Sequence, residues 1–342
     1  MNTVTKVARA LRFDKVGSLE NLKLEKIELP LLKSGEAYVR VRASGINMSD
    51  VVSVLGWLPF TTTPRTPGRD FSGVVEEVAD QQNEKWIGKE VWGTGGEVGF
   101  TLDGAHSSVI KVHVDALSEK PTTLNFAQAA SVGLPWLCAH LAVKTLAKVE
   151  EDDNVLIIGA RGAIGSAALQ MCSQIRVKNI FGTYSKSPPK VTSHIPIDLS
   201  SYPSPARFLT DHGFRNKITV VIDAYGSDAL INDVMDVLDS NGRGKIVVMA
   251  VHNKDGHASL NLRKFYAKSL TLLGLSSGRM NPVDGARMLD TLRPHFDDGT
   301  YKIGKDVTEV PFDSLENIVK AYQATLDRSS QERLILTMKG EQ

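Results

Sequence analysis

Three regularly spaced glycines follow an apolar run near the middle of the sequence. Val155–Ile158 leads directly into Gly159, Gly162 and Gly165, and an apolar, helix-compatible stretch continues to Cys172. Glycine permits a tight turn and lets a ligand approach the backbone, and the free N–H groups at the start of the following helix attract a pyrophosphate. The GxxGxxG spacing is one residue longer than the GxGxxG fingerprint. The prediction of a dinucleotide-binding turn therefore depends on the strand before the glycines and the helix after them.

We therefore expect a dinucleotide-binding turn. Its contact residues are expected to be Gly159, Ala160, Arg161, Gly162, Ala163, Ile164 and Gly165. Two alternatives stay open from the residues alone. The glycines also fit an α/β turn that binds no ligand, and Arg161 fits a solvated side chain as well as a pyrophosphate contact.

The end of the next apolar run bears on which dinucleotide is bound. Enzymes that use NAD place an acid about 20 residues after the glycine turn, where it accepts hydrogen bonds from the ribose 2′-hydroxyl. Here Asn179–Gly182 is followed by Thr183, then Tyr184, Ser185 and Lys186, with Lys190 close behind. Hydroxyl and ammonium groups suit a 2′-phosphate, which a carboxylate would repel. The sequence favours NADPH, with Lys190 alone fitting a solvated lysine equally well.

The sequence around these motifs divides into two regions that differ in their predicted secondary structure. Up to about Thr123 the chain reads as short β-rich segments, such as Glu36–Ala43, Phe71–Val78 and Ser107–His113. From Asn125, helical stretches such as Phe126–Leu146 alternate with apolar runs that lack polar alternation, which is typical of a parallel sheet buried on both faces. These runs are Val155–Ile158, Asn179–Gly182, Ile218–Ile222, Lys245–Ala250 and Leu270–Leu275.

The tail returns to strand texture. Asp306–Val310 and Arg333–Met338 are expected as strands on either side of a helix over Ser314–Leu326. A tail of this kind is expected to rejoin the first region.

Composition excludes several classes of partner. Lysine plus arginine number 40 against 39 acids, and the formal net charge of +1 provides no field for nucleic acid or an acidic membrane surface. The two cysteines, Cys138 and Cys172, suit a reducing compartment. No run of about 18 apolar residues occurs and the N-terminus lacks a signal-peptide core. We expect a soluble, cytoplasmic protein whose partners are small molecules.

Across nearly its whole length the sequence resembles the medium-chain dehydrogenase/reductases, in particular their zinc-independent, quinone oxidoreductase-like branch. Besides the glycine turn, the matching segments fall in the family's order: Ala43–Asp50 (ASGINMSD), Thr66–Val75 (TPGRDFSGVV), Gly88–Trp92 (GKEVW), Gly104–Val109 (GAHSSV), Ala129–Ala142 (AASVGLPWLCAHLA), Val221–Gly226 (VIDAYG) and Gly242–Val248 (GRGKIVV). The resemblance implies an α/β protein with a GroES-like β-rich catalytic domain at 1–127, completed by 299–342, and a Rossmann domain at 128–298.

The resemblance also implies an active site in the cleft between the domains and a homodimer or tetramer, often formed by pairing edge strands of the Rossmann sheets. Leu270–Leu275 is the segment expected at that edge, with a buried interior strand as the alternative.

The zinc ligands of the alcohol-oxidising relatives are missing. Those relatives hold zinc with cysteine, histidine and a second cysteine or acid. This chain has Asn47 to Asp50 where the first cysteine would lie and Arg69 before Asp70 where the histidine would lie, and two distant cysteines cannot form the structural four-cysteine lobe. We expect metal-free chemistry.

Without a Lewis acid, the expected acceptor is a quinone or an alkene conjugated to a carbonyl. The resemblance places Asn47 near the nicotinamide and substrate, where its amide is suited to stabilise an enolate; a structural turn residue is the alternative. Trp57 and Phe60, with Leu58 and Pro59, are expected to form an apolar wall or simply to pack the domain, and Arg69 is a candidate substrate contact.

The helix on the nicotinamide side departs from the family pattern. Cys138 and His140 stand where many relatives have threonine and tyrosine. His140 is a candidate proton donor, although a packing histidine is favoured. Arg333 falls near a family position that reaches the 2′-phosphate. The remaining expected cofactor contacts are Cys138, Ala224, Tyr225, Ala250, Val251 and Ser276.

Two further functions stay open. A CoA-thioester reductase of the acrylyl-CoA type would need a basic docking patch that the sequence does not reveal. A catalytically idle NADPH-binding protein is the alternative from another class, and the intact segment around Asn47 argues against it.

Overall fold

Contacts divide the chain into two compact units. The computed structural model describes residues 6–185, 187–250 and 256–338. Unit 1 comprises Met1–Leu134 and Ser277–Gln342, and unit 2 comprises Pro135–Ser276. The second boundary lies earlier than the sequence-based one at 298, because α8 (Pro282–Asp297) packs against β5 (Glu90–Gly93) and β7 (Ser118–Glu119) of unit 1.

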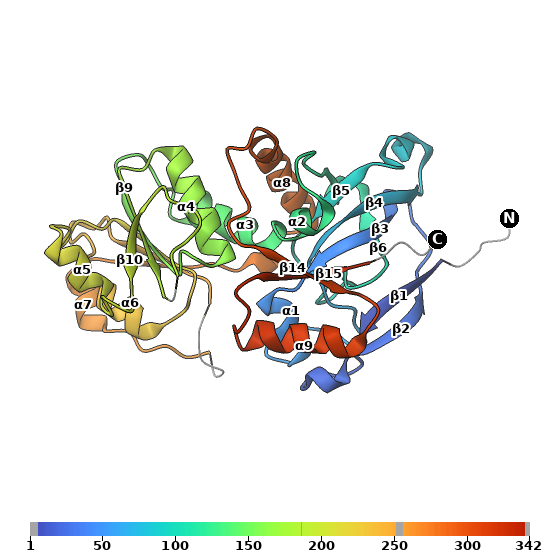
Figure 1. The fold of residues 1–342 in the computed structure, drawn as a ribbon, viewed down its shortest axis with the longest axis horizontal. Coiled ribbons are helices and arrows are strands. Elements are labelled where there is room, and N and C mark those ends of the chain that lie inside the picture. Colours follow the sequence, from blue (N-terminus) through green and yellow to red (C-terminus); the bar gives the residue numbers. More distant parts are fainter. Residues whose placement is uncertain (1–5, 186, 251–255, 339–342) are drawn as a thin grey trace. The chain divides into compact units, whose positions relative to one another are not determined.

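Unit 1 is built around β3 (Glu36–Gly45). This strand lies in a seven-stranded sheet of order β14-β15-β3-β4-β5-β7, with β6 also paired to β3. The other strands are β4 (Asp70–Val78), β6 (Val109–His113), β14 (Val307–Pro311) and β15 (Arg333–Thr337), and a separate antiparallel pair is formed by β1 (Val7–Arg12) and β2 (Lys23–Glu28). The C-terminal strands β14 and β15, red in Figure 1, thus lie beside the blue N-terminal strand β3. The tail rejoins the first unit, as the sequence predicted.

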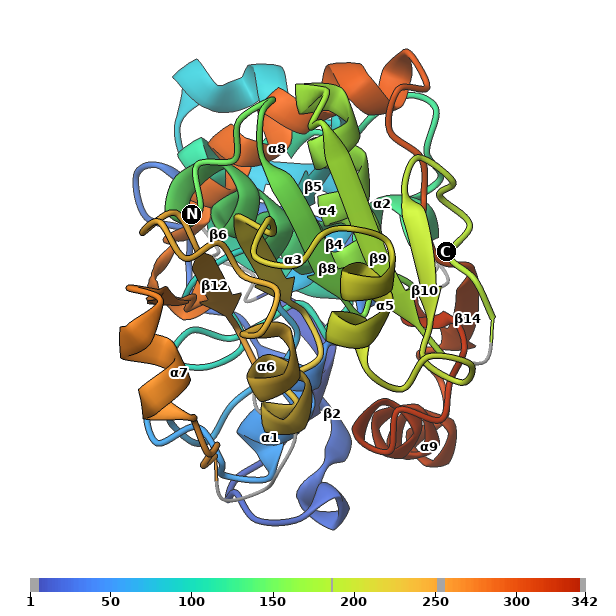
Figure 2. The same ribbon diagram turned by 90° about the vertical axis from the view of Figure 1, so that its left-hand side faces the viewer.

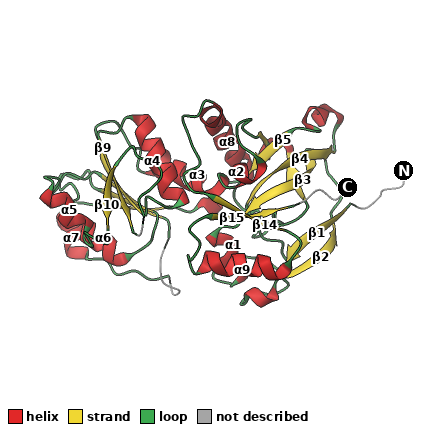
Figure 3. Cartoon of the chain, in the orientation of Figure 1, coloured by secondary structure: helices red, strands yellow, loops and turns green. Residues whose placement is uncertain are grey.

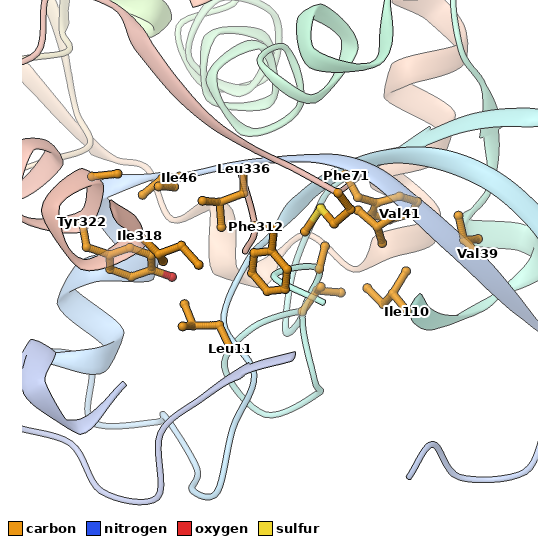
Figure 4. Close-up of a cluster of buried hydrophobic side chains, with 14 of the residues drawn as sticks. Leu11, Val39, Val41, Ile46, Phe71, Ile110, Phe312, Ile318, Tyr322 and Leu336 are labelled. Atoms are coloured by element: carbon orange, nitrogen blue, oxygen red, sulfur yellow. The ribbon is translucent and has the colours of Figure 1, made fainter. Parts of the chain in front are cut away.

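Helices and short helical turns cover the unit 1 sheet, as Figure 3 shows in red. They are η1 (Leu19–Asn21), α1 (Met48–Val54), η2 (Gln81–Trp86), η3 (Val114–Ala116), α2 (Phe126–Ala130), η5 (Ser277–Arg279), α8 and α9 (Leu315–Leu326). Figure 4 shows Phe312, Ile318 and Tyr322 lying with Leu11, Val41 and Ile110 in one apolar cluster. Residues more than 200 positions apart in sequence therefore share the core of this unit.

Unit 2 is a parallel α/β sheet. Its six strands, β8 (Asn154–Ile158), β9 (Asn179–Tyr184), β10 (Ile195–Asp198), β11 (Val220–Asp223), β12 (Lys245–Val248) and β13 (Thr271–Gly274), lie in the order β10-β9-β8-β11-β12-β13 and all pair in parallel. Counted along the chain this is the order 3-2-1-4-5-6 of the Rossmann fold. Figure 2 shows the sheet with α4 beside β8 and β9.

Helices connect most of these strands. The connecting helices are α4 (Ala163–Ile175), α5 (Pro205–Asp211), α6 (Asp228–Val234) and α7 (Leu262–Ala267). Before β8, the chain forms α3 (Gly133–His140), which begins in unit 1 and ends in unit 2, and a π-helical turn over Leu141–Leu146. The α/β class, the GroES-like and Rossmann architecture and five of the six strands agree with the sequence prediction. The helical stretch predicted over Phe126–Leu146 is divided into α2, α3 and the π-helical turn.

One crossover was not predicted. The chain passes from β9 to β10 through residues 185–194, and the described part of that segment, which leaves out 186, contains no helix. Strand β10 was also missing from the sequence prediction. Among the described residues, no helix is long and apolar enough to cross a membrane.

Candidate functional site

The glycine turn, residues 159–165, is fixed to the end of β9. Gly159 has a φ of +80°, which a side chain would disfavour. Its N–H donates to Thr183 Oγ1 at 3.0 Å, and the N–H of Ala160 donates to the Thr183 carbonyl at 2.9 Å. Thr183 thus holds both the first glycine and its neighbour, so the turn that leaves β8 is positioned by β9.

Gly165 and Gly182 lie at places around the turn where a side chain would collide with a neighbour. A Cβ at Gly165 would lie 2.3 Å from the Gly159 carbonyl oxygen and 2.7 Å from Ala160 Cα. A Cβ at Gly182, on β9, would lie 2.8 Å from the Ala160 methyl group. Both contacts are closer than real Cβ atoms tolerate, so the helix, the turn and the neighbouring strand fit only with glycine at these places.

The turn opens into the N-terminus of α4. Gly162 is the N-cap, and the first backbone bond of the helix runs from Ser166 N–H to the Gly162 carbonyl at 2.8 Å. The N–H groups of Ala163, Ile164 and Gly165 precede that bond and therefore have no acceptor inside the helix. The first turn contains no acidic residue. Together with the helix dipole, these donors suit a phosphate group.

The turn also lies where the strand order reverses. Strand β8 pairs with β9 on one side and β11 on the other, and ligands of open α/β sheets bind at the carboxyl ends of strands at such a point. The N–H of Ala224 donates to the Ile158 carbonyl at 3.1 Å, and a Cβ at Gly159 would be 3.5 Å from Tyr225 Cβ. The structure thus brings Ala224 and Tyr225, both expected cofactor contacts, beside the glycine turn.

The residues expected near the ribose lie at the end of β9. Tyr184 is half-buried, and Ser185 and Lys190 are exposed. Lys186, like Val251, lies outside the described residues. Sequence reasoning missed Asp198, which pairs with Tyr184 from the neighbouring strand β10 and whose Oδ1 accepts from the N–H and hydroxyl of Ser200 at 2.9 and 2.7 Å. Strand register alone reveals this carboxylate, because it lies 14 positions after Tyr184 in sequence.

Four further expected contacts lie elsewhere in unit 2. Ala250 follows the end of β12 and Ser276 follows that of β13, the adjacent strand. Cys138 and His140 lie on α3, and Cys138 is buried. Burial, and secondarily the charge of Lys144, lower the pKa of His140 below its usual value.

A second set of residues gathers in unit 1 around a buried carboxylate, Asp70. Its Oδ1 accepts from Thr94 Oγ1 at 2.6 Å and from the Leu134 N–H at 2.8 Å, and its Oδ2 accepts from Asn47 Nδ2 at 2.9 Å. Burial raises the pKa of Asp70 while the hydrogen bonds from Thr94 and Asn47 oppose that rise. We call Asn47, Asp50, Asp70, Thr94 and Arg333 the polar cluster.

Asn47 is held from both ends of its amide. Its Oδ1 accepts from Arg333 Nη2 at 2.9 Å, while Nδ2 donates to Asp70. Its backbone N–H donates to Asp50 Oδ2 at 2.8 Å, and it is the N-cap of α1. The side chain is 3% exposed. These bonds fix the orientation of the Asn47 amide. They use one of the two N–H groups on Nδ2 and leave the other for a further acceptor.

Asp50 is fully buried beside Asn47. Desolvation raises the pKa of its carboxyl to about 7, and the charge of Asp70 adds to that rise. Its second oxygen has no hydrogen-bond partner among the described residues. Sequence reasoning named Asp50 only as a position lacking a zinc ligand, since a carboxylate on a short helix carries no signal of its burial.

The two arginines predicted as ligand contacts lie inside unit 1. Arg69 is 1% exposed, donates to the hydroxyl and carbonyl of Ser277 at 3.0 and 3.1 Å, and stacks over the Phe100 ring at 5.0 Å. Arg333, on β15, donates to the Ile46 carbonyl at 3.1 Å in addition to Asn47. Both guanidinium groups thus donate hydrogen bonds to groups of the protein itself, a role that the sequence did not predict.

The apolar residues after α1 are exposed. Trp57 and Phe60 are 42% and 50% exposed, and Phe60 makes an edge contact with Phe100 at 5.5 Å between ring centroids. Exposed rings on a loop are available to an apolar ligand. Among residues 6–185, 187–250 and 256–338, no three histidine, cysteine, aspartate or glutamate side chains are grouped as a metal site requires.

Comparison with known proteins agrees with this fold. Residues 33–122 match the family described as the alcohol dehydrogenase GroES-like domain. A zinc-type alcohol dehydrogenase-like protein of Schizosaccharomyces pombe is 30% identical over 97% of both chains, and the quinone oxidoreductase of Mus musculus is 27% identical over 81% of this chain and 82% of its own. The crystal structure of a quinone oxidoreductase from Pseudomonas syringae pv. Tomato DC3000 superposes with a TM-score of 0.80 at 25% identity, covering 96% of this chain and 99% of that one.

A GroES-like unit combined with a Rossmann sheet and its glycine turn defines an oxidoreductase that uses a nicotinamide cofactor. The chain belongs to the medium-chain dehydrogenase/reductase superfamily and is similar to its quinone oxidoreductase-like members.

Proposed function

We propose that this protein is an NADPH-dependent reductase that transfers hydride to a quinone or to a C=C bond conjugated to a carbonyl, without zinc. The observation that carries the proposal is the glycine turn at the switch point of a 3-2-1-4-5-6 sheet, with the α4 amides directed at one place. NADPH supplies the hydride when bound, and the chain binds and orients it.

The preference for NADPH rests on the end of β9. Ser185, directly after that strand, occupies the place where NAD enzymes carry an acid, and Tyr184 and Lys190 add a hydroxyl and an ammonium group. Asp198 on β10 opposes this preference, although Ser200 holds one of its oxygens. We propose Ser185, Lys186 and Lys190 as the residues around the 2′-phosphate.

The polar cluster supports a metal-free site. Asp70 is occupied by three protein donors, and the charge of Arg333 lies 4.0 Å from it. A cation at this place would displace those bonds and face a guanidinium group. The remaining Asn47 N–H is the proposed donor to the acceptor carbonyl, where it would stabilise negative charge that develops during hydride transfer. Trp57 and Phe60 are the proposed apolar wall.

His140 is a weaker candidate for the proton donor. The lowered pKa keeps its ring neutral at pH 7, so the residue fits the packing role better than the acid role. Arg69, buried against Ser277, is proposed to support the site rather than to contact substrate. We propose further that the enzyme acts in a reducing, cytoplasmic compartment, since the sequence has only two cysteines, Cys138 and Cys172, and both are buried.

A catalytically idle NADPH-binding protein is the second candidate. The observation that favours it is the near-complete occupation of the Asn47 amide by Asp70 and Arg333. Turnover distinguishes the two functions. Oxidation of NADPH by a quinone or an enone supports the reductase, whereas tight NADPH binding with no turnover across both panels supports the idle protein.

The cofactor preference is tested by fluorescence titration with NADPH and NADH. The wild type should bind NADPH more tightly. Ser185→Asp introduces the acid that NAD enzymes carry at this place. The affinity for NADPH should fall at least tenfold, about 1.4 kcal/mol, while the affinity for NADH should change little. Ser329→Asp, an exposed site after α9 in unit 1, makes the same charge change and should leave both affinities as they are. A wild type that prefers NADH would overturn the assignment.

A further inference from the structure

A cavity in unit 1 contains none of the residues proposed above for the cofactor or the substrate. Its volume is about 210 Å³, and its polar lining consists of Arg9, Arg40, Arg42, Ser108, Asp313 and Thr337. Val41, Phe312 and Met338 are among the apolar residues of its wall. We call it the arginine cavity.

The cavity arises from the way strands share one edge of β3. Strand β6 pairs with the first half of β3, ending at Arg40 opposite Val109, and β15 pairs with the second half, from Ala43 opposite Thr337. Two backbone bonds lie along the edge between them, from the Val41 N–H to the Ser108 carbonyl at 3.0 Å and from the Met338 N–H to the Arg42 carbonyl at 3.0 Å. Two strand ends therefore meet there.

A β-bulge directs Arg42 at this place. On the other side of β3, Val41 pairs with Gly73 and Ala43 pairs with Ser72, so Arg42 is the extra residue. Bulges re-aim side chains and are common beside binding sites. The partner strand tolerates the bulge only with glycine, since a Cβ at Gly73 would lie 2.1 Å from the Arg40 carbonyl oxygen.

The charges around the cavity do not balance. Arg40 is paired with Glu76. Arg9 donates to the Asp313 backbone carbonyl at 3.0 Å, and Arg42 stacks on the Phe126 ring at 6.0 Å. Within the described part of the chain, neither Arg9 nor Arg42 forms an ion pair with a carboxylate, and Asp313, which is exposed, is the sole acid of the lining. Half-buried guanidinium groups without a counter-charge are costly unless an anion binds them.

We propose that the arginine cavity binds a small organic anion, a phosphate or carboxylate group on an apolar body. Arg42 and Arg9 would hold the anionic oxygens, because a guanidinium group presents paired donors that match them. Pro311, a half-buried residue of the cavity wall, would contact the apolar part. Ligand pockets for drug-sized molecules measure roughly 300–1,000 Å³, so the cavity selects a smaller ligand.

The proposal does not depend on the proposed function. The cavity residues belong to unit 1, and the glycine turn belongs to unit 2. A probe that binds the arginine cavity should therefore bind with or without NADPH, whereas a phosphate probe that takes the place of the cofactor should be displaced by NADPH.

Isothermal titration with phenyl phosphate and with hexanoate, at constant ionic strength, tests the site. The wild type should bind at least one of them saturably at a single site per chain, and the probe that binds tells a phosphate site from a carboxylate site. Arg42→Gln should weaken binding at least tenfold, and Arg42→Lys should fall in between because it keeps the charge but loses the paired donors. Arg287→Gln, on the exposed face of α8, is the matched control and should bind like the wild type.

Three results would overturn the proposal: no saturable binding of either probe, equal binding by Arg42→Gln, or complete displacement by NADPH. Circular dichroism establishes that each variant is folded. Should Arg42→Gln fail to fold, Arg9→Gln carries the same test, since its guanidinium group lines the same cavity from β1.

Discussion

At the scale of single residues, the buried ionisable groups of unit 1 are the feature that the sequence does not reveal. Asp50, Asp70 and Arg333 are separated by up to 283 positions and meet because β15 pairs with β3. The resemblance to a family motif marked Asn47 as a candidate site residue, and its role stays a prediction. The sequence did not predict that Arg333 and Asp70 hold the two ends of the Asn47 amide, because that contact depends on sheet register.

The titration of Asp50 should be visible in the stability of the protein. Its pKa is about 7 in the folded protein against a reference of 3.8, so the folded state holds a proton that the unfolded state releases between those values. Its contribution to stability is present below about pH 4 and is lost as the pH rises through 7. Between pH 5 and 8 the loss amounts to roughly 2–3 kcal/mol.

Asp50→Asn removes this titration and keeps an acceptor for the Asn47 N–H. The free energy of unfolding of the variant, minus that of the wild type, should therefore rise by about 2 kcal/mol from pH 5 to pH 8. Urea unfolding at each pH measures this difference. Asp211→Asn, at an exposed site on α5, is the control. If Asp50→Asn and the wild type change in parallel over this range, the carboxyl is ionised in the folded protein and the interpretation is wrong.

The titration of His106 changes the stability of the protein with pH in the opposite direction and at lower pH. Burial lowers its pKa from 6.5 to about 4, and its ring nitrogens contact the Tyr322 hydroxyl at 2.5 Å and the Gly45 carbonyl at 3.2 Å. The stability that its neutral form provides is complete above pH 6.5 and is lost as the pH falls towards 4. The comparison of Asp50→Asn with the wild type cancels this contribution, since both proteins contain His106.

At the scale of elements, the β8–turn–α4 unit was predictable and the β9–β10 crossover was not. The unit has three local requirements: a buried strand, a positive φ at Gly159 and a glycine at the close contact. Each of them restricts the residue types at positions close together in the sequence, so a sequence pattern can reveal it. The crossover has no helical periodicity to read. Strand β10 spans only Ile195–Asp198 and contains a proline, so its pattern is too short to distinguish from a loop.

Gly165→Ala should test the importance of the close contact in the turn. The added Cβ would lie 2.3 Å from the Gly159 carbonyl oxygen, so the turn must shift away from α4. We expect NADPH affinity to fall at least tenfold and the free energy of unfolding to fall by about 1–3 kcal/mol. Fluorescence titration and urea unfolding measure the two effects.

Gly274→Ala is the matched control for this change. A Cβ at Gly274 meets nothing within 4 Å, and the residue lies on β13 of the same sheet. NADPH binding should therefore be unchanged in Gly274→Ala. Equal losses in both variants would mean that the glycine turn has no special part in cofactor binding.

At the scale of the whole molecule, the β13 edge of the unit 2 sheet is the place where two copies are proposed to meet. The sequence prediction placed Leu270–Leu275 at an edge, and β13 is indeed the last strand of the sheet. Leu272 is 43% exposed, and Leu262 and Tyr266 on α7 are 66% and 71% exposed. An exposed strand edge beside apolar side chains is a liability unless another chain covers it, so we propose a homodimer that pairs β13 with its copy.

The backbone of β13 identifies the groups that would pair. Thr271 and Leu275 donate their N–H groups towards β12, to the carbonyls of Gly244 and Val248 at 2.9 and 2.8 Å. Because successive residues of a strand alternate in direction, the N–H of Leu272 faces the open edge. Leu272→Pro removes that donor without breaking the pairing with β12, and proline is tolerated on edge strands.

Sedimentation velocity should therefore show a dimer for the wild type and a monomer for Leu272→Pro. Leu272→Ala separates the backbone from the side chain, since it keeps the N–H and removes only apolar contact. It should weaken the dimer without abolishing it, because the strand pairing remains. A wild type that sediments as a monomer, or a Leu272→Pro variant that stays dimeric, would show that β13 is not the interface, and the exposed side chains of α7 would then need another explanation.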